Sequence, residues 1–257
     1  MFKYIRIVLI VLPRLIFDYF KWMIKFSKNP EKYPIELRYE KVRSLVTYVL
    51  NHWPMKLEHH NHEYLKNQEK CCLIVPNHIS DIDPLIFIYL SERPISFVAK
   101  KETSKYPFVG RILRIINGQF IDRDDVKSQI GVFREIKKKI EENELSYLIF
   151  AEGTRNKVKD STLLEFHAGT LKPAYWAKTN IIGCSIYGSD RMLPTKTKLK
   201  YYPVILNFVK PFVYSEYKDI TTTELAPTLR DMVQKNYDES MKEYYEKYSS
   251  IIKKDRD

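Results

Sequence analysis

Short hydrophobic runs, separated by polar or helical segments, follow one another along the chain from residue 55 onward. The runs that predict β-strands are Leu73–Val75, Ile95–Ala99, Gln119–Ile121, Leu145–Phe150, Ile181–Ile186 and Val204–Phe212. One intervening segment carries hydrophobic residues at helical spacing, namely Val126, Ile130, Phe133, Ile136 and Ile140. Strands that alternate with helices predict an α/β layered domain with a mixed, largely parallel central sheet flanked by helices.

Further helices are predicted on either side of this alternating region. Leu37–Leu50 has the pattern of a helix that precedes the first predicted strand. Near the other end, Thr221 and Glu224 have the spacing of a capping box, and hydrophobic residues then recur at helical spacing. We expect this terminal helix to be amphipathic and to pack against the domain.

The N-terminal segment combines a wide hydrophobic face with a narrow charged stripe. The stripe consists of Arg14, Asp18, Lys21, Lys25 and Lys28. A wide hydrophobic face with basic residues and an interfacial tryptophan, here Trp22, is typical of a helix that lies in a membrane surface. A helix docked on the protein core also has a wide hydrophobic face. We expect residues 1–30 to form an amphipathic membrane-anchoring segment and residues 31–257 to form the α/β domain.

The chain carries no signal for export or for crossing a membrane. No hydrophobic run reaches the roughly 18 residues that a spanning helix requires, and no signal-peptide cleavage site follows Ile7–Leu12. The 3 cysteines, Cys71, Cys72 and Cys184, do not form a closed disulfide set, which is typical of a reduced, cytosol-facing protein. We therefore expect the protein at the cytoplasmic face of a membrane.

The formal net charge of +11 favours a polyanionic partner. Nucleic acid, an anionic membrane and a phosphorylated substrate all meet this requirement, so charge alone does not choose among them. Glycine is scarce, with only 7 residues in the chain. Such glycines mark positions where the backbone needs a positive φ or approaches a ligand closely.

The densest group of polar residues lies between a predicted strand that ends at Pro76 and a predicted helix that begins at Pro84. There, His78 follows the carboxyl end of a strand, where α/β sheets carry their functional sites. A carboxylate at Asp83 would fix the imidazole tautomer and leave the other ring nitrogen free to take a proton from a hydroxyl. In the alternative interpretation, Asp83 is a plain helix N-cap and His78 is a loop histidine.

Basic side chains follow other predicted strands. The clusters are Gly118-Gln119-Phe120-Ile121-Asp122-Arg123 and Phe150-Ala151-Glu152-Gly153-Thr154-Arg155. In the later cluster, Gly153 frees backbone N–H groups to face an anion, Thr154 adds a hydroxyl, and Arg155 supplies a planar fork that matches phosphate. A salt-bridged arginine after a strand is the alternative for Arg123.

Histidines gather at His59, His60 and His62. Alternate positions on a strand share a face, so His60 and His62 could bind a metal ion. No cysteine or third ligand stands at a recognisable spacing. We therefore expect surface or strand histidines and no metal.

Taken together, these clusters resemble the motifs of the 1-acyl-sn-glycerol-3-phosphate acyltransferase family, the PlsC-type glycerolipid acyltransferases. The matching motifs are Asn77-His78-x-Ser80-x-x-Asp83 for the H-x4-D signature, Phe120-Ile121-Asp122-Arg123 for the second motif and Glu152-Gly153-Thr154-Arg155 for the third. Further similar stretches are Ala99-Lys100-Lys101-Glu102, Pro107-Phe108-Val109-Gly110 and Phe166-x-x-Gly169. The resemblance covers about residues 70 to 190, in the family's order and spacing.

The sequence departs from the family pattern in places. Ala151 stands where the family usually has proline, and Gly118 and Phe120 are one residue closer than usual. Ile181–Ile186 only loosely resembles the fourth motif, which normally carries proline.

The resemblance implies transfer of a fatty acyl group from acyl-CoA or acyl carrier protein to the hydroxyl of lysophosphatidic acid, which gives phosphatidic acid in phospholipid biosynthesis. It implies that His78 is the general base and that Asp83 orients the imidazole, with no covalent intermediate, cofactor or metal. It implies that Arg123 and Arg155 bind the acceptor phosphate. The other substrate-binding candidates are Lys101, Glu152, Gly153 and Thr154. An anionic membrane surface is the expected partner, and nucleic acid is not.

Other functions stay open. Within acyl transfer, the acceptor is instead glycerol-3-phosphate or another lysophospholipid. In a different class, the chain is a non-catalytic basic protein that binds membranes or nucleic acid and needs no histidine–aspartate pair. A metal hydrolase built on residues 59–62 is the remaining alternative.

Overall fold

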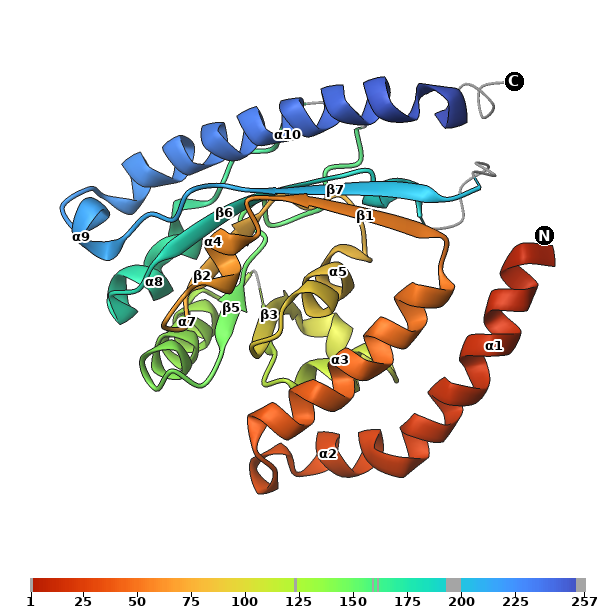
Figure 1. The fold of residues 1–257 in the computed structure, drawn as a ribbon. Helices are drawn as coiled ribbons and strands as arrows, with labels where there is room; N and C mark the ends of the chain where they lie inside the picture. Colours follow the sequence, from red (N-terminus) through yellow and green to blue (C-terminus); the bar gives the residue numbers. More distant parts are fainter. Residues whose placement is uncertain (1, 123, 159, 161, 193–199, 253–257) are drawn as a thin grey trace.

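The computed structural model describes residues 2–122, 124–158, 160, 162–192 and 200–252. Within these residues, a seven-stranded sheet has the strand order β1-β7-β6-β2-β5-β3-β4, and helices lie on both sides of it (Figure 1). The strands are β1 (Met55–His60), β2 (Leu73–Pro76), β3 (Ile95–Lys100), β4 (Gln119–Ile121), β5 (Ser146–Leu148), β6 (Ile181–Tyr187) and β7 (Tyr202–Phe208).

Helices precede β1, occupy most of the connections between the strands and follow β7. They are α1 (Phe2–Asp18), α2 (Ile24–Lys28), α3 (Ile35–His52), α4 (Glu63–Lys66), α5 (Asp83–Leu90), α6 (Val109–Ile115), α7 (Val126–Glu141), α8 (Lys172–Ala177), α9 (Tyr214–Tyr217) and α10 (Thr222–Ile252). A π-helical turn, η1 (Tyr19–Met23), joins α1 to α2, and short 3₁₀ turns are η2 (Pro30–Lys32), η3 (Lys101–Lys105), η4 (Ala168–Leu171) and η5 (Ser189–Arg191).

The sheet is mixed and largely parallel, as the alternation of strands and helices predicts. β2 pairs in parallel with β5 and β6, β3 pairs in parallel with β4 and β5, and β1 pairs in parallel with β7. β6 and β7 run antiparallel. The carboxyl ends of β2, β5 and β6 therefore meet at one edge, where the loops that follow them converge.

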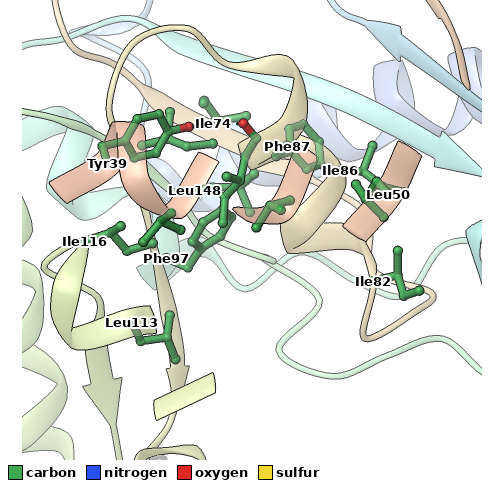
Figure 2. Close-up of a cluster of buried hydrophobic side chains, with 14 of the residues drawn as sticks. Tyr39, Leu50, Ile74, Ile82, Ile86, Phe87, Phe97, Leu113, Ile116 and Leu148 are labelled. Carbon is green, nitrogen blue, oxygen red and sulfur yellow. Dashed lines mark hydrogen bonds between the residues drawn. The ribbon is translucent and has the colours of Figure 1, made fainter. Parts of the chain in front are cut away.

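Each face of the sheet has its own hydrophobic core, because successive side chains of a strand point to opposite faces. On one face, Ile74 and Leu148 pack in a cluster with residues of α3, α5 and α6, which Figure 2 shows. On the other face, Leu73 and Val75 pack with residues of α7, α8 and α10. All residues of β2 are buried, which explains its unbroken hydrophobic run.

Every predicted strand is present; β4 has the predicted ends, and the ends of the others differ. β5 is shorter than the predicted Leu145–Phe150, and β7 begins earlier and ends earlier than the predicted Val204–Phe212. Proline at position 211 cannot donate to a ladder, and after it Phe212 bridges back to Ile181.

Strand β1 was not among the sequence predictions, because its polar side chains hide the period of a strand. It pairs with β7 and has no other strand neighbour in the described sheet. At its end, His60 Nε2 lies 2.7 Å from a carboxylate oxygen of Glu243, and the His59 ring lies 4.8 Å from that of His62. The described residues contain no group of three or more histidine, cysteine, aspartate or glutamate side chains that could hold a metal ion.

The N-terminal helices present two hydrophobic faces rather than one. The inner face is buried and consists of Ile7, Val11, Trp22, Met23 and Phe26, and the last three belong to the core cluster on the α3 side. The outer face is exposed and consists of Val8, Leu9, Leu12, Ile16, Phe17 and Phe20. The inner face therefore docks on the core, as in the alternative interpretation. The outer face is hydrophobic and exposed.

The predicted charged stripe is not uniformly exposed. Asp18 is buried and accepts a hydrogen bond from Arg14 Nε at 2.5 Å, whereas Lys21, Lys25 and Lys28 are exposed. Among the described residues, no helix is both long enough and sufficiently apolar to cross a bilayer.

Helix α10 begins with the predicted capping box and covers the second face of the sheet (Figure 1). The Thr221 amide donates to Glu224 at 2.9 Å, and the Glu224 amide donates to Thr221 Oγ1 at 3.3 Å. At the far end of the helix, Lys247 and Tyr248 donate to the Glu58 carboxylate on β1. Burial raises the pKa of Glu58, but these hydrogen bonds outweigh it and lower the pKa to about 2.

We expect Glu58→Gln to weaken the attachment of α10 to β1. Because the pKa of Glu58 is about 2 against an ordinary 4.5, its stabilisation is complete above pH 4.5 and is lost as the pH falls toward 2. The variant should lose about 1 kcal/mol of unfolding free energy at pH 7 and progressively less toward pH 2, as measured by chemical denaturation.

Glu246→Gln is the matched control, because that side chain is 67% exposed and lies 4.0 Å from Lys242. Its effect should stay within about 0.5 kcal/mol. A Glu58→Gln effect that is equal at both ends of the pH range would contradict the role of the ionised carboxylate.

Candidate active site

Most of the predicted site residues come from the segments that follow β2 and β5. β2 ends at Pro76, and the loop that follows carries His78 and leads into α5. The segment after β5 carries Glu152, Gly153, Thr154 and Arg155. Because these strands are parallel neighbours, both loops emerge at the same edge of the sheet.

His78 and Asp83 form the pair that the sequence predicts. His78 Nδ1 lies 2.9 Å from Asp83 Oδ2, the His78 side chain is 17% exposed, and the Asp83 side chain is fully buried. The carboxylate accepts from Nδ1, which places the proton of the neutral imidazole on that nitrogen and makes Nε2 the basic one. Among the described residues, no hydrogen bond to Nε2 is present.

Asp83 is not the plain helix N-cap of the alternative interpretation. The N-cap position of α5 is Ile82, and Asp83 is the first residue of the helix. The Asp83 carboxylate instead accepts from the amides of Ile79 at 2.9 Å and Ser80 at 2.8 Å, within the preceding loop. Ser189 Oγ donates to the other carboxylate oxygen at 2.5 Å. The buried charge therefore organises the loop that carries the histidine.

Further contacts hold the ring and the backbone of His78. Its ring stacks on Phe150, with centroids 3.9 Å apart and planes 20° apart. The His78 amide donates to Glu152 Oε1 at 2.7 Å, and the His78 carbonyl accepts from the Asn156 amide at 2.8 Å. The segment after β5 therefore fixes both the backbone and the ring of His78.

Glu152 is buried and contacts the backbone of His78 rather than its imidazole ring. It is 3% exposed, and its second oxygen accepts from the Leu164 amide at 3.0 Å. Burial raises the pKa of Glu152 above its ordinary value, and the hydrogen bonds from the two amides oppose that rise.

The next residues of this loop approach the surface. Gly153 has φ +67, and a Cβ added there would lie 3.0 Å from the His167 ring, so glycine suits this turn. Thr154 is exposed. Arg155 forms an ion pair with Asp81, and their side chains are 39% and 66% exposed. The guanidinium therefore lies beside the histidine loop, held by an exposed and exchangeable partner.

The second predicted motif is described only in part. Lys101 Nζ lies 3.4 Å from Asp122 Oδ2, at the surface after β3 and β4. Arg123 lies outside the described residues.

Sequence reasoning gave Asn77 no role beyond its place in the first motif, and it missed Ser189. Asn77 is buried and joins the end of β2 to β6, through bonds of 2.7 and 3.1 Å to the backbone of Ile186. Ser189 reaches Asp83 from the turn after β6. The available signal was Gly188, one of the chain's 7 glycines, which has φ +89 directly before this serine.

The cysteines are poor nucleophiles. All are free and buried, and burial raises the pKa of the Cys72 thiol to about 12 and raises that of Cys71. A thiol that stays protonated at neutral pH does not attack a thioester or ester.

An imidazole held by a buried carboxylate at the edge of an α/β sheet has the geometry to accept a proton from a hydroxyl. Comparison with known proteins gives the reaction class. A family model described as "Acyltransferase" matches residues 56–187. The chain belongs to the acyltransferase family, and the resemblance seen in its motifs is confirmed.

Similar proteins carry consistent names. The chain is 30% identical over 245 residues to a probable 1-acyl-sn-glycerol-3-phosphate acyltransferase of Mycoplasma genitalium, with 89% of each chain covered. It is 29% identical over 168 residues to the 1-acyl-sn-glycerol-3-phosphate acyltransferase of Borreliella burgdorferi, with 63% of this chain and 64% of that one covered.

A solved structure shares the fold. The crystal structure of the 1-acyl-sn-glycerophosphate (LPA) acyltransferase, PlsC, from Thermotoga maritima matches with a TM-score of 0.69 and 20% identity, and covers 93% of this chain and 98% of that chain. The predicted α/β fold is therefore confirmed.

Proposed function

We propose that this protein transfers a fatty acyl group from an acyl thioester, carried by CoA or acyl carrier protein, to the free hydroxyl of lysophosphatidic acid. The observation that carries the proposal is the His78–Asp83 contact of 2.9 Å, in which the carboxylate is fully buried and the His78 side chain is 17% exposed. The names of the relatives support the acceptor.

The reaction uses His78 as the base. Nε2 takes the proton of the acceptor hydroxyl while that oxygen attacks the thioester carbonyl, and Asp83 stabilises the imidazolium that forms. Collapse of the tetrahedral intermediate breaks the carbon–sulfur bond, and the imidazolium returns its proton to the departing thiolate. No acyl-enzyme forms, because the acceptor oxygen attacks the donor directly.

The acceptor phosphate binds to cations at the rim. Arg155 lies beside the His78 loop through its ion pair with Asp81, and Lys101 lies beside Asp122. Exposed pairs of this kind contribute little stability, so a phosphate can replace the carboxylate as the partner of each cation. Arg123 stays a predicted phosphate ligand, and Gly153 and Thr154 stay predicted contacts of the bound substrate.

Glu152 acts on the substrate through the histidine. Its two oxygens accept from the amides of His78 and Leu164, so the carboxylate sets the position of the His78 backbone.

We expect His78→Ala to reduce acyl transfer by about 10²–10⁴-fold, the usual contribution of a general base. Asp83→Asn should lower kcat strongly and leave the acceptor KM nearly unchanged, because the carboxylate contacts the imidazole and not the phosphate. Release of CoA from acyl-CoA in the presence of lysophosphatidic acid measures both variants.

The acceptor series tests the substrate itself. Glycerol-3-phosphate and other lysophospholipids, assayed beside lysophosphatidic acid, should give lower kcat/KM values. Activity of His78→Ala equal to wild type would overturn the mechanism, and a preferred different acceptor would replace the proposed one.

Arg155→Ala should raise the acceptor KM about tenfold, the value of one hydrogen bond to a charged group, with kcat less affected. Arg134→Ala, at an exposed position of α7, is the control and should leave the acceptor KM unchanged. Equal KM values for both variants would remove Arg155 from the phosphate site.

Residues 1–30 bind the membrane, and part of this segment also packs against the domain formed by residues 31–257. The outer face of α1 and η1 exposes hydrophobic side chains, with Leu9 67% and Phe20 71% exposed. Tyr19 links this face to Phe108, whose ring lies 5.1 Å away and which is itself partly exposed. Exposed hydrophobic residues beside Lys21 and Lys25 suit an anionic membrane surface, on its cytoplasmic side.

We expect Phe20→Ser and Leu9→Ser each to weaken binding to anionic phospholipid vesicles about tenfold or more, because each removes a hydrophobic side chain from the bilayer. Both residues are exposed, so thermal unfolding should be unchanged. Ile220→Ser, at a 40% exposed position next to α10, is the control. Unchanged sedimentation of the Phe20 and Leu9 variants with vesicles would place the membrane contact elsewhere. Deletion of residues 1–28 is a poorer test, because Trp22, Met23 and Phe26 belong to the core.

A further inference from the structure

The two oxygens of the Asp83 carboxylate have different environments. Oδ2 accepts from His78 Nδ1 and from the amides of Ile79 and Ser80, at 2.8 to 2.9 Å. Oδ1 accepts a hydrogen bond from Ser189 Oγ at 2.5 Å. Within the described residues, this is the one donor seen at that oxygen. A buried carboxylate with an unsatisfied oxygen is costly, so this hydroxyl is needed to keep the charge in place.

The donors to Oδ2 all belong to the loop that Asp83 itself ends, so they move with it. Ser189 comes from a different part of the chain, the turn η5 after β6. The last torsion of an aspartate side chain is broad, and among the described residues Ser189 is the donor to Asp83 that comes from outside this loop. The hydroxyl of Ser189 therefore fixes the orientation of the Asp83 carboxylate relative to the sheet, because Ser189 lies in the turn directly after β6.

The backbone around Ser189 is built to hold that hydroxyl still. Gly188 has φ +89, and an added Cβ would lie 2.5 Å from the carbonyl oxygen of Pro203, so the turn requires glycine. Ser189 is fully buried. Two residues on, the Arg191 guanidinium lies over the rings of Tyr187 and Tyr244, at 5.0 and 4.8 Å. Both sides of the serine are thus fixed by packing.

We propose that Ser189 is a positioning residue for the His78–Asp83 pair. Its hydroxyl holds the Asp83 carboxylate in the orientation that directs Oδ2 at His78 Nδ1, and it thereby fixes the imidazole for proton transfer at Nε2. Ser189 donates the same hydrogen bond before and after the imidazole takes a proton, so it moves no proton itself. Its effect on turnover rests on the proposed acyl transfer, whereas its effect on the imidazole does not.

The kinetic test is Ser189→Ala, measured with acyl-CoA and lysophosphatidic acid. Loss of one hydrogen bond to a buried charge should lower kcat about 10- to 100-fold, with the acceptor KM changed less than about threefold because Ser189 is fully buried behind Asp83.

Ser185→Ala is the matched control. Ser185 is a fully buried serine of the same segment, and its hydroxyl has no hydrogen-bond partner among the described residues. Its kcat should stay within about twofold of wild type. A decrease in kcat of the same size in both variants would overturn the proposal.

A double-mutant cycle separates positioning from general damage to the fold. In an Asp83→Asn background the carboxylate is absent, so adding Ser189→Ala should cost less than about twofold. An equal cost in both backgrounds would show that Ser189 acts independently of Asp83. If Ser189→Ala does not fold, Ser189→Cys replaces it, because a thiol fills the site but is a weak donor.

Proton NMR of the His78 Nδ1–H gives a readout that does not depend on activity. In wild type this proton should exchange slowly with water, in Ser189→Ala faster, and in Ser185→Ala at the wild-type rate. Wild type without acyl transfer but with this exchange pattern would refute the proposed function and leave the positioning role. If acyl transfer requires His78 but the Nδ1 proton exchanges at the same rate in the two serine variants, the proposed function stands and the positioning role of Ser189 is refuted.

Discussion

The rest of the site depends on one buried charge, the carboxylate of Asp83. Its environment excludes water, so its lone pairs must be met by protein donors, and these come from the imidazole of His78, two loop amides and the hydroxyl of Ser189. Each donor is held by a larger element: the loop by β2 and α5, and the serine by the turn after β6. The geometry of the histidine thus follows from how the sheet edge is assembled.

The buried strands of the fold could be predicted from the sequence, because their positions are marked by the pattern of hydrophobic residues. β2 is buried on both faces, which agrees with its unbroken run of apolar residues. β1 could not be found in this way, because it contacts one neighbouring strand and exposes polar side chains. The ends of β5 and β7 depend on hydrogen bonds to other strands, which hydrophobicity does not encode.

In the candidate site, the contacts within one local segment could be predicted from the sequence, and the contacts between distant segments could not. His78 and Asp83 lie within one strand–loop–helix unit, so their contact follows from local geometry. Glu152 has the predicted place in its loop, but its partners are amides of His78 and Leu164, which only the folded chain brings near. The link from Ser189 to Asp83 joins residues 106 positions apart, and its local sequence signal is the single glycine Gly188. The charged stripe of the first helices likewise differs from the helical projection, because Asp18 turns inward.

The position of α10 has a consequence for synthesis on the ribosome. This helix, Thr222–Ile252, covers the sheet face that holds Leu73, Val75 and Ile181. All seven strands have left the ribosome before its residues emerge, since β7 ends at Phe208. The nascent chain therefore exposes the part of this apolar face that α10 covers until residues 222–252 have emerged. Exposed apolar surface of this kind favours aggregation during that interval.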